Sequence, residues 1–137
     1  LFLADRVRRV VGVEYVAEAV DRARENATLN GYSNAEFHAG DVREILSSVD
    51  RAGARLPRPD IVVLDPPRAG VHPDVIAELR RLRPRQILYV SCKPSTQARD
   101  LAMLAEEYDV TRVQPVDMFP QTFHIESVVD LRRKEGA

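Results

Sequence analysis

Short runs of apolar and β-branched residues alternate along the chain with longer segments in which apolar positions recur at helical spacing. The apolar runs predict strands at 10–14, 35–39, 61–64 and 87–90, with two further strands around 110–115 and 127–132. The segments between them predict helices at 16–29, from 41 through 46, from 73 onward and at 94–107. Strands that alternate with helices in this way predict an α/β fold with a mostly parallel sheet.

Turn residues separate these elements and sharpen their expected ends. Asn30-Gly31 is expected to end the first helix, and Pro73 suits the first turn of a later one. The prolines within 51–59 predict a loop there. The uninterrupted apolar run at 61–64 is typical of a strand buried on both faces, and 87–90 predicts another buried strand.

Composition limits the class of protein. The chain has 137 residues, of which 45% are hydrophobic and 30% charged, as expected for one soluble globular domain with a real core. No apolar run approaches the roughly 20 residues of a membrane span, and this places the chain in the cytoplasm, without a membrane partner. A formal net charge of -1 argues against nucleic-acid binding driven by a general excess of basic residues. The arginine clusters at 6–9 and 80–85 could contact phosphates, but such clusters are more often solvated helix faces.

Three acidic residues lie at or just after the ends of predicted strands, where an open parallel sheet binds its ligands. Glu14 could accept hydrogen bonds from ribose hydroxyls, although an exposed glutamate that caps a helix fits the sequence as well. Asp41 could bind an adenine amino group or simply cap the next helix. Asp65 opens the stiff segment Asp65-Pro66-Pro67-Arg68, whose prolines hold it at the strand end. Their shared position favours an adenosyl ligand.

The single cysteine, Cys92, lies between a buried strand and a helix. It has no second cysteine for a disulfide or at metal-ligand spacing, so no metal site is expected, and any special role must come from its thiolate. Lys93 and the helix N-terminus favour that thiolate. The alternative is a small, buried and inert thiol. A thiolate that adds to C6 of a pyrimidine makes C5 nucleophilic, and a base must later remove the C5 proton. Glu126, just before the last strand, offers that base.

Three segments in this order resemble the RNA uracil-5 methyltransferases, which make 5-methyluridine in tRNA or rRNA. They are Asp65-Pro-Pro-Arg68, the segment from Ser91 to Asp100 (Ser-Cys-Lys-Pro-Ser-Thr-x-Ala-Arg-Asp) and the segment from Asp117 to Glu126 (Asp-Met-Phe-Pro-x-Thr-x-His-Ile-Glu). The family commonly has Asn at the position of Lys93, a difference that leaves the nucleophile in place.

The resemblance implies S-adenosyl-L-methionine as cofactor and tRNA or rRNA as partner. By position, Cys92 matches the nucleophile and Glu126 the proton-abstracting base, while Glu14, Asp41 and Asp65 match cofactor contacts. The implied fold is the class I methyltransferase version of the doubly wound sheet, with an antiparallel last strand.

That fold normally begins with a strand and a glycine-rich turn, and neither precedes Glu14. Residues 1–9 resemble instead the tail of the helix that would follow the turn. We therefore expect residues 1–137 to be a single truncated catalytic domain that binds the cofactor poorly alone, or that completes its sheet by swapping or dimerising.

Other functions remain open from the sequence. A base-amino or protein methyltransferase would need the acidic positions but not Cys92, although the amino-methylating enzymes usually have an aromatic residue where this chain has Arg68. A non-catalytic RNA-binding module would need neither Cys92 nor Glu126. A 5-methylcytosine enzyme usually employs a second cysteine, which this chain lacks. Phe119 and Phe123 could border a base pocket or pack in the core, and Asp100 is expected to anchor its helix.

Overall fold

A computed structural model describes residues 1–51 and 56–136 of the chain. The described residues form two compact units, Leu1–Ser48 and Val49–Ala137. The loop expected at 51–59 falls partly on residues 52–55, which lie outside the described residues. Within the described part of the chain, no helix is long and apolar enough to cross a membrane.

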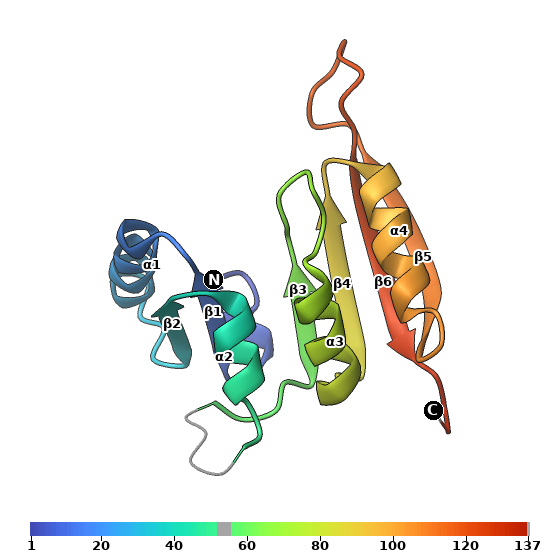
Figure 1. Cartoon of the computed structure of the whole chain (residues 1–137). Helices are drawn as coiled ribbons and strands as arrows, with labels where there is room; N and C mark the ends of the chain where they lie inside the picture. The colour runs from blue at the N-terminus through green and yellow to red at the C-terminus, as the bar shows by residue number, and fades with distance from the viewer. Residues whose placement is uncertain (52–55, 137) are drawn as a thin grey trace. The chain divides into compact units, whose positions relative to one another are not determined.

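The first unit is a pair of parallel strands with two helices (Figure 1). Strands β1 (Val10–Glu14) and β2 (Ala35–Ala39) pair in register from Val10↔Ala35 to Glu14↔Ala39. Helix α1 (Ala17–Leu29) connects them, and helix α2 (Val42–Ser48) follows β2. Helix α1 stops where the sequence predicts, because Asn30 caps it and Gly31 takes a φ of 73° that favours glycine.

Residues 1–9 contain a short 3-10 helix at Ala4–Arg6, so the helical tail expected there is present only as a single 3-10 turn. The side chain of Asn34 binds the carbonyl groups of Ala4 and Val7 at 2.8 and 3.0 Å and fixes the path of this segment.

The second unit is a four-stranded sheet in the order β3-β4-β6-β5 (Figure 1). Its strands are β3 (Ile61–Leu64), β4 (Gln86–Ser91), β5 (Tyr108–Val116) and β6 (Glu126–Arg133). Strands β3 and β4 are parallel, whereas β6 runs antiparallel to both of its neighbours. The antiparallel last strand agrees with the expected fold class.

Helices α3 (Pro73–Leu82) and α4 (Pro94–Leu104) belong to the same unit, where they contact each other and α4 contacts β4. Buried residues of both helices are part of this unit's core. The fully buried side chains include Leu79 of α3, Leu104 of α4 and Ile87 of β4. Alternate residues of β4 and β6 are buried, which is the pattern of a sheet with one covered face. The expectation that 61–64 is buried on both faces is therefore wrong, since Val63 is 48% exposed.

Candidate active site

Three candidate residues lie at one end of the second unit's sheet, each next in the chain to a residue that is paired with a neighbouring strand. Leu64 of β3 pairs with Tyr89 of β4, and Asp65 comes directly after that pair. Ser91 of β4 pairs with Ser127 of β6. Strands β4 and β6 are antiparallel, so the residue after Ser91 and the residue before Ser127 lie on the same side of this pair. These two residues are Cys92 and Glu126. The topology thus brings Asp65, Cys92 and Glu126 to the same edge of the sheet.

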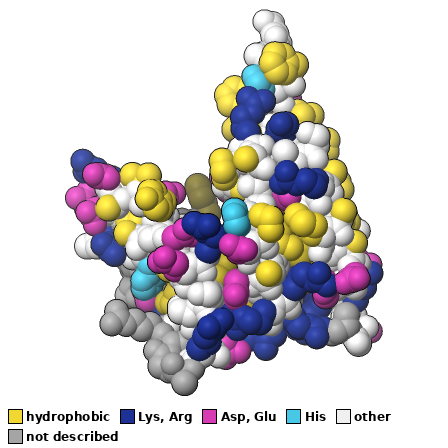
Figure 2. Space-filling model, in the orientation of Figure 1, with side chains coloured by type: hydrophobic (Ala, Val, Ile, Leu, Met, Phe, Trp, Pro, Cys, Tyr) yellow, Lys and Arg dark blue, Asp and Glu magenta, His cyan; other side chains and the backbone are white. Residues whose placement is uncertain are grey.

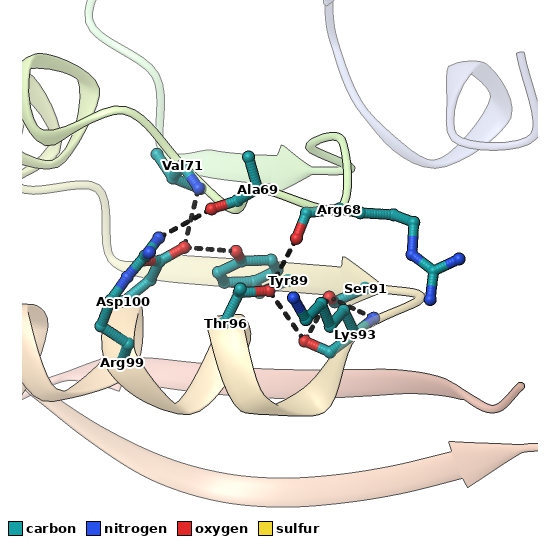
Figure 3. Close-up of polar contacts among 9 residues, drawn as sticks. All are labelled: Arg68, Ala69, Val71, Tyr89, Ser91, Lys93, Thr96, Arg99 and Asp100. Atoms are coloured by element: carbon teal, nitrogen blue, oxygen red, sulfur yellow. Dashed lines mark hydrogen bonds and ion pairs between the residues drawn. The ribbon is translucent and has the colours of Figure 1, made fainter.

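The turn that carries Cys92 is held by its neighbours (Figure 3). Buried Ser91 accepts a hydrogen bond from the Lys93 amide at 3.0 Å, and its hydroxyl lies 3.2 Å from the Lys93 carbonyl oxygen. Pro94 then starts α4 with its fixed φ. Cys92 itself is a free cysteine and is only half-buried. Its thiol is therefore on a rigid turn and within reach of solvent, as a nucleophile must be.

A buried glutamine joins this turn to the strand that begins with Glu126. The Gln97 side chain in α4 is 2% exposed and donates to the Tyr89 carbonyl at 2.9 Å and to the Ser127 carbonyl at 3.2 Å. One side chain thus fixes α4 to both strands whose ends carry Cys92 and Glu126. Glu126 is half-buried at the start of β6 and pairs in register with Val116 of β5.

The loop at 117–125, between β5 and β6, carries exposed aromatic side chains. Phe119 is 52% and Phe123 89% exposed, and both rings lie beside His124, at centroid distances of 6.4 and 4.3 Å. Figure 2 shows hydrophobic and histidine side chains gathered at the top of the view, where Figure 1 draws this loop. Core packing is therefore not the role of either phenylalanine. An exposed aromatic loop beside Glu126 can offer ring faces to a planar ligand.

The loop after β3 begins with exposed Asp65 and is tied to α4 by hydrogen bonds (Figure 3). The Val71 amide donates to the Asp100 carboxylate at 2.7 Å, and Arg99 donates to the Ala69 carbonyl at 2.9 Å. Thr96 in the first turns of α4 lies 3.2 Å from the Arg68 carbonyl oxygen. Asp65 thus belongs to a loop whose far end is fixed.

Tyr89 completes this link from the sheet. Its hydroxyl donates to Asp100 at 2.7 Å, and both side chains are fully buried. Burial, and next the hydrogen bond to the Asp100 carboxylate, raise the pKa of Tyr89 above its usual value. Both effects favour the neutral phenol, which is the form that donates to Asp100.

In the first unit, the structure brings Glu14 and Asp41 to the ends of neighbouring parallel strands. Glu14 ends β1 opposite Ala39, and its backbone carbonyl accepts from the Gly40 amide at 3.0 Å. Its carboxylate accepts from the Val16 amide at 2.9 Å, through one oxygen. Asp41 accepts from the Arg43 amide at 2.8 Å and also pairs with the Arg43 guanidinium. Asp41 thus caps α2, as the alternative from the sequence expected, whereas Glu14, among the described residues, accepts only from the N-cap residue Val16 and makes no capping bond to α1.

The hydrogen-bonded link between the loop and α4 was not predictable from the local pattern. The sequence indicates only that Asp100 anchors its helix, whereas its partners Val71 and Tyr89 lie in other elements. One signal was available in the sequence, the glycine at position 70 shortly after the two prolines at 66 and 67. In the structure Gly70 takes a φ of 87°. A glycine at such a position indicates a turn or a close approach of backbone and side chain.

Comparison with known proteins gives a family and a fold. The family described as tRNA (Uracil-5-)-methyltransferase matches residues 1–134. A protein of Bacteroides thetaiotaomicron, named an uncharacterized RNA methyltransferase, is 48% identical over 130 residues, which is 93% of this chain and 28% of that protein. A protein of the same name from Porphyromonas gingivalis is 49% identical over 136 residues, which is 96% of this chain and 28% of that protein. The chain thus spans less than a third of either relative's length.

Two solved structures illustrate the range of the fold. The tRNA (uracil-54, C5)-methyltransferase of Pyrococcus abyssi, in complex with S-adenosyl-L-homocysteine, has 38% sequence identity and a TM-score of 0.78, and the match covers 95% of this chain and 30% of that one. A dimethyladenosine transferase from Plasmodium falciparum has 19% identity and a TM-score of 0.65, over 93% of this chain and 48% of that one, and shares the fold alone. The α/β class I methyltransferase fold expected from the sequence is confirmed.

Proposed function

Because the chain belongs to the tRNA (uracil-5-)-methyltransferase family, we propose that the protein methylates carbon 5 of uridine in RNA through a covalent adduct on Cys92. One observation supports this most: Cys92 and Glu126 flank the same register pair, Ser91↔Ser127. A nucleophile and a base are both needed at the target ring, and this pairing brings their backbones together.

The proposed reaction begins when the Cys92 thiolate adds to C6 of the uracil ring. The electron pair of the C5–C6 double bond moves into the ring's C4 carbonyl system and makes C5 a nucleophile. C5 then takes the methyl group as the bond between that group and the donor sulfur breaks and leaves its electron pair on the sulfur, and C5 still carries its own proton. Glu126 removes that proton, and the electrons of the C5–H bond restore the double bond as the Cys92 sulfur leaves. The products are 5-methyluridine, the demethylated donor and a regenerated thiolate, and the proton on Glu126 passes to solvent.

We propose S-adenosylmethionine as the methyl donor, since a structural relative was solved with S-adenosylhomocysteine. When bound, this cofactor supplies an electrophilic methyl group. Glu14 fits the ribose, because only one of its carboxylate oxygens has a hydrogen-bond partner among the described residues. Asp41, at the end of the next parallel strand, fits the adenine amino group. Exposed Asp65 fits the part of the cofactor nearest the reacting centre.

The proposed RNA contact includes the aromatic loop at 117–125. RNA bases that leave a stack are commonly held against aromatic side chains, and Phe119 and Phe123 expose their rings beside Glu126. The structural relative named above acts on tRNA, and the family name agrees with a tRNA substrate. The match of this family across residues 1–134 also supports the proposal that both compact units belong to one methyltransferase domain.

A base-amino methyltransferase is the second candidate, because Asp65-Pro66-Pro67 also suits that chemistry. The two reactions differ at C5, since only uracil-5 methylation releases the C5 hydrogen. The whole protein is therefore incubated with cofactor and with tRNA or rRNA transcripts that carry tritium at C5 of uridine. We expect one tritium released to water for each methyl group transferred, and neither event in a Cys92→Ala variant. Methyl transfer without tritium release would instead favour amino methylation.

A further inference from the structure

A buried carboxylate in α4 receives hydrogen bonds from three separate parts of the chain. Asp100 is 0% exposed, and its Oδ2 accepts from the Val71 amide and the Tyr89 hydroxyl, each at 2.7 Å. Its Oδ1 accepts from Nε and Nη2 of Arg99 at 2.9 and 2.7 Å. A buried charge is costly unless it is paired and hydrogen-bonded, and all of these donors meet that need.

These bonds attach the loop after β3 to the helix after Cys92 (Figure 3). Val71 is bound to Asp100, and Arg99 reaches over to the Ala69 carbonyl at 2.9 Å. The Thr96 hydroxyl, one turn closer to Cys92, lies 3.2 Å from the Arg68 carbonyl. The loop that starts at Asp65 is therefore held along its second half by α4, whose first residues continue directly from the cysteine turn.

The packing around Gly70 shows how close this contact is. A Cβ at Gly70 would lie 2.5 Å from Asp100 Oδ2 and 2.6 Å from Arg99 Nη2, closer than real atoms approach. The φ of 87° at Gly70 also turns the backbone so that the neighbouring Val71 amide and Ala69 carbonyl both face α4. The loop thus has one backbone path against the carboxylate, with no room for a side chain.

We propose that Asp100 is a positioning residue, which holds the 65–71 loop on α4 and so fixes Asp65 relative to Cys92. The inference rests on the proposed function, in which Asp65 contacts the cofactor near the reacting centre and Cys92 is the nucleophile. Methyl transfer requires reacting groups held near their final geometry, and a misplacement of about 1 Å can lower a rate by about 100-fold. Asp100 touches neither the uracil nor the cofactor in this account.

Asp100→Asn tests the proposal in the whole protein, because it keeps the shape of the side chain but removes the charge and one acceptor. We expect kcat for methyl transfer to RNA to fall by about 10- to 100-fold, with a change in KM for RNA of less than about threefold. A merely structural residue would lower the melting temperature but leave kcat unchanged well below it. An unchanged kcat in a folded Asp100→Asn protein overturns the proposal.

Two buried tyrosines give a matched pair that keeps the test decisive if Asp100→Asn does not fold. Tyr89→Phe removes one donor to Asp100, whereas Tyr108→Phe removes a buried hydroxyl that donates to the Pro84 carbonyl at 2.8 Å, away from the loop. We expect Tyr89→Phe to lower kcat several-fold more than Tyr108→Phe does, even if the two variants lose the same free energy of unfolding. Equal kcat values in the two variants contradict the proposal.

Amide hydrogen exchange of peptides covering 65–71 separates this inference from the proposed function. Exchange at Val71 should accelerate in Asp100→Asn and Tyr89→Phe, but not in Tyr108→Phe, because only the first two weaken the bond to the loop. The methylated product is identified in the same reactions. A product other than 5-methyluridine overturns the proposed function alone, whereas unchanged exchange at Val71 overturns the positioning role whatever the product.

Discussion

In the proposed reaction Cys92 and Glu126 have different tasks at the same uracil ring, and variants of the two residues can separate these tasks. Cys92 is half-buried on a turn that Ser91 holds through hydrogen bonds to Lys93. Glu126 starts β6, so its backbone is fixed by pairing with Val116 of β5. In the proposed sequence of steps the cysteine acts first and the glutamate last. Removing the glutamate should therefore stop the reaction after the covalent bond has formed.

Glu126→Gln tests this order. We expect turnover to fall by about 100-fold or more, because a glutamine cannot take the C5 proton. A methylated protein–RNA adduct should then accumulate on ordinary RNA and survive a denaturing gel. Glu135→Gln, at an exposed glutamate of the same unit, is the matched control and should turn over normally without an adduct. Normal turnover by Glu126→Gln would exclude Glu126 as the base.

The sequence allowed the candidate residues to be predicted, but not how they are held. Apolar runs that end in acidic residues point to Glu14 and Asp65 without any structure. The pairing of Ser91 with Ser127 depends on the strand order, which no local pattern contains. The bonds of Asp100 to Val71 and Tyr89 depend on packing between elements and could not be predicted for the same reason.

At the scale of elements, the loop after β3 leaves no room for an added side chain at Gly70. Gly70 and Gly31 both have positive φ, at 87° and 73°. A Cβ at Gly31 meets nothing within 4 Å, whereas at Gly70 it collides with Asp100. Substitutions at the two glycines can therefore be compared to separate the free-energy cost of the positive φ from the cost of the contact with Asp100.

Gly31→Ala and Gly70→Ala make this a stability prediction. We expect Gly31→Ala to lower the free energy of unfolding by about 1 kcal/mol, from the positive φ alone. Gly70→Ala should cost about 1 to 3 kcal/mol more, because the buried carboxylate must move or lose its donors. Denaturant unfolding of both variants gives the comparison. Equal losses would mean that Asp100 has room to move and that the loop is not closely held.

Element boundaries followed the sequence where turn residues mark them. The strands at Ala35–Ala39 and Ile61–Leu64 have their expected bounds. Helix α4 was expected to reach Glu107 but ends at Leu104. The side chains of Glu106 and Glu107 both pair with Arg80 of α3, and the Glu107 amide turns back to the Leu104 carbonyl at 3.1 Å. A contact between helices thus overrides the local helical pattern.

At the scale of the whole molecule, the buried tyrosines link stability to alkaline pH. Burial raises the pKa of Tyr108, and burial followed by the bond to Asp100 raises that of Tyr89. An unfolded chain loses these phenol protons above about pH 10, while the folded protein retains them. The stabilisation that these two tyrosines contribute to the free energy of unfolding should therefore be complete below pH ~10, and it should decrease as the pH rises beyond that value.

Denaturant unfolding between about pH 8 and pH 11 measures this dependence. The fall above pH ~10 should be less steep in Tyr89→Phe and in Tyr108→Phe than in the unmodified protein. Tyr15→Phe, at a side chain that is 80% exposed, is the control and should leave the slope unchanged. A slope that is the same in all proteins would mean that the two buried phenols ionise as readily as those of the unfolded chain.

The fold class was predictable because the order of strands and helices and three motifs agree, and the family match over residues 1–134 includes all three. The burial of the sheet was not. An apolar run such as Ile61–Leu64 predicts two covered faces, yet Val63 remains 48% exposed. Hydrophobicity along a strand shows which side chains can be buried, and only the arrangement of the other elements decides which of them are.

The covalent adduct on Cys92 is the central claim, and 5-fluorouridine tests it most directly, since its C5 fluorine cannot leave as a proton. The whole protein is mixed with cofactor and RNA that contains this nucleoside, then denatured. We predict a stable protein–RNA adduct whose RNA is attached to Cys92 and which Cys92→Ala does not form. Methylation of ordinary RNA without any adduct on the fluorinated RNA would contradict the cysteine mechanism and leave an amino-methylating enzyme as the better account.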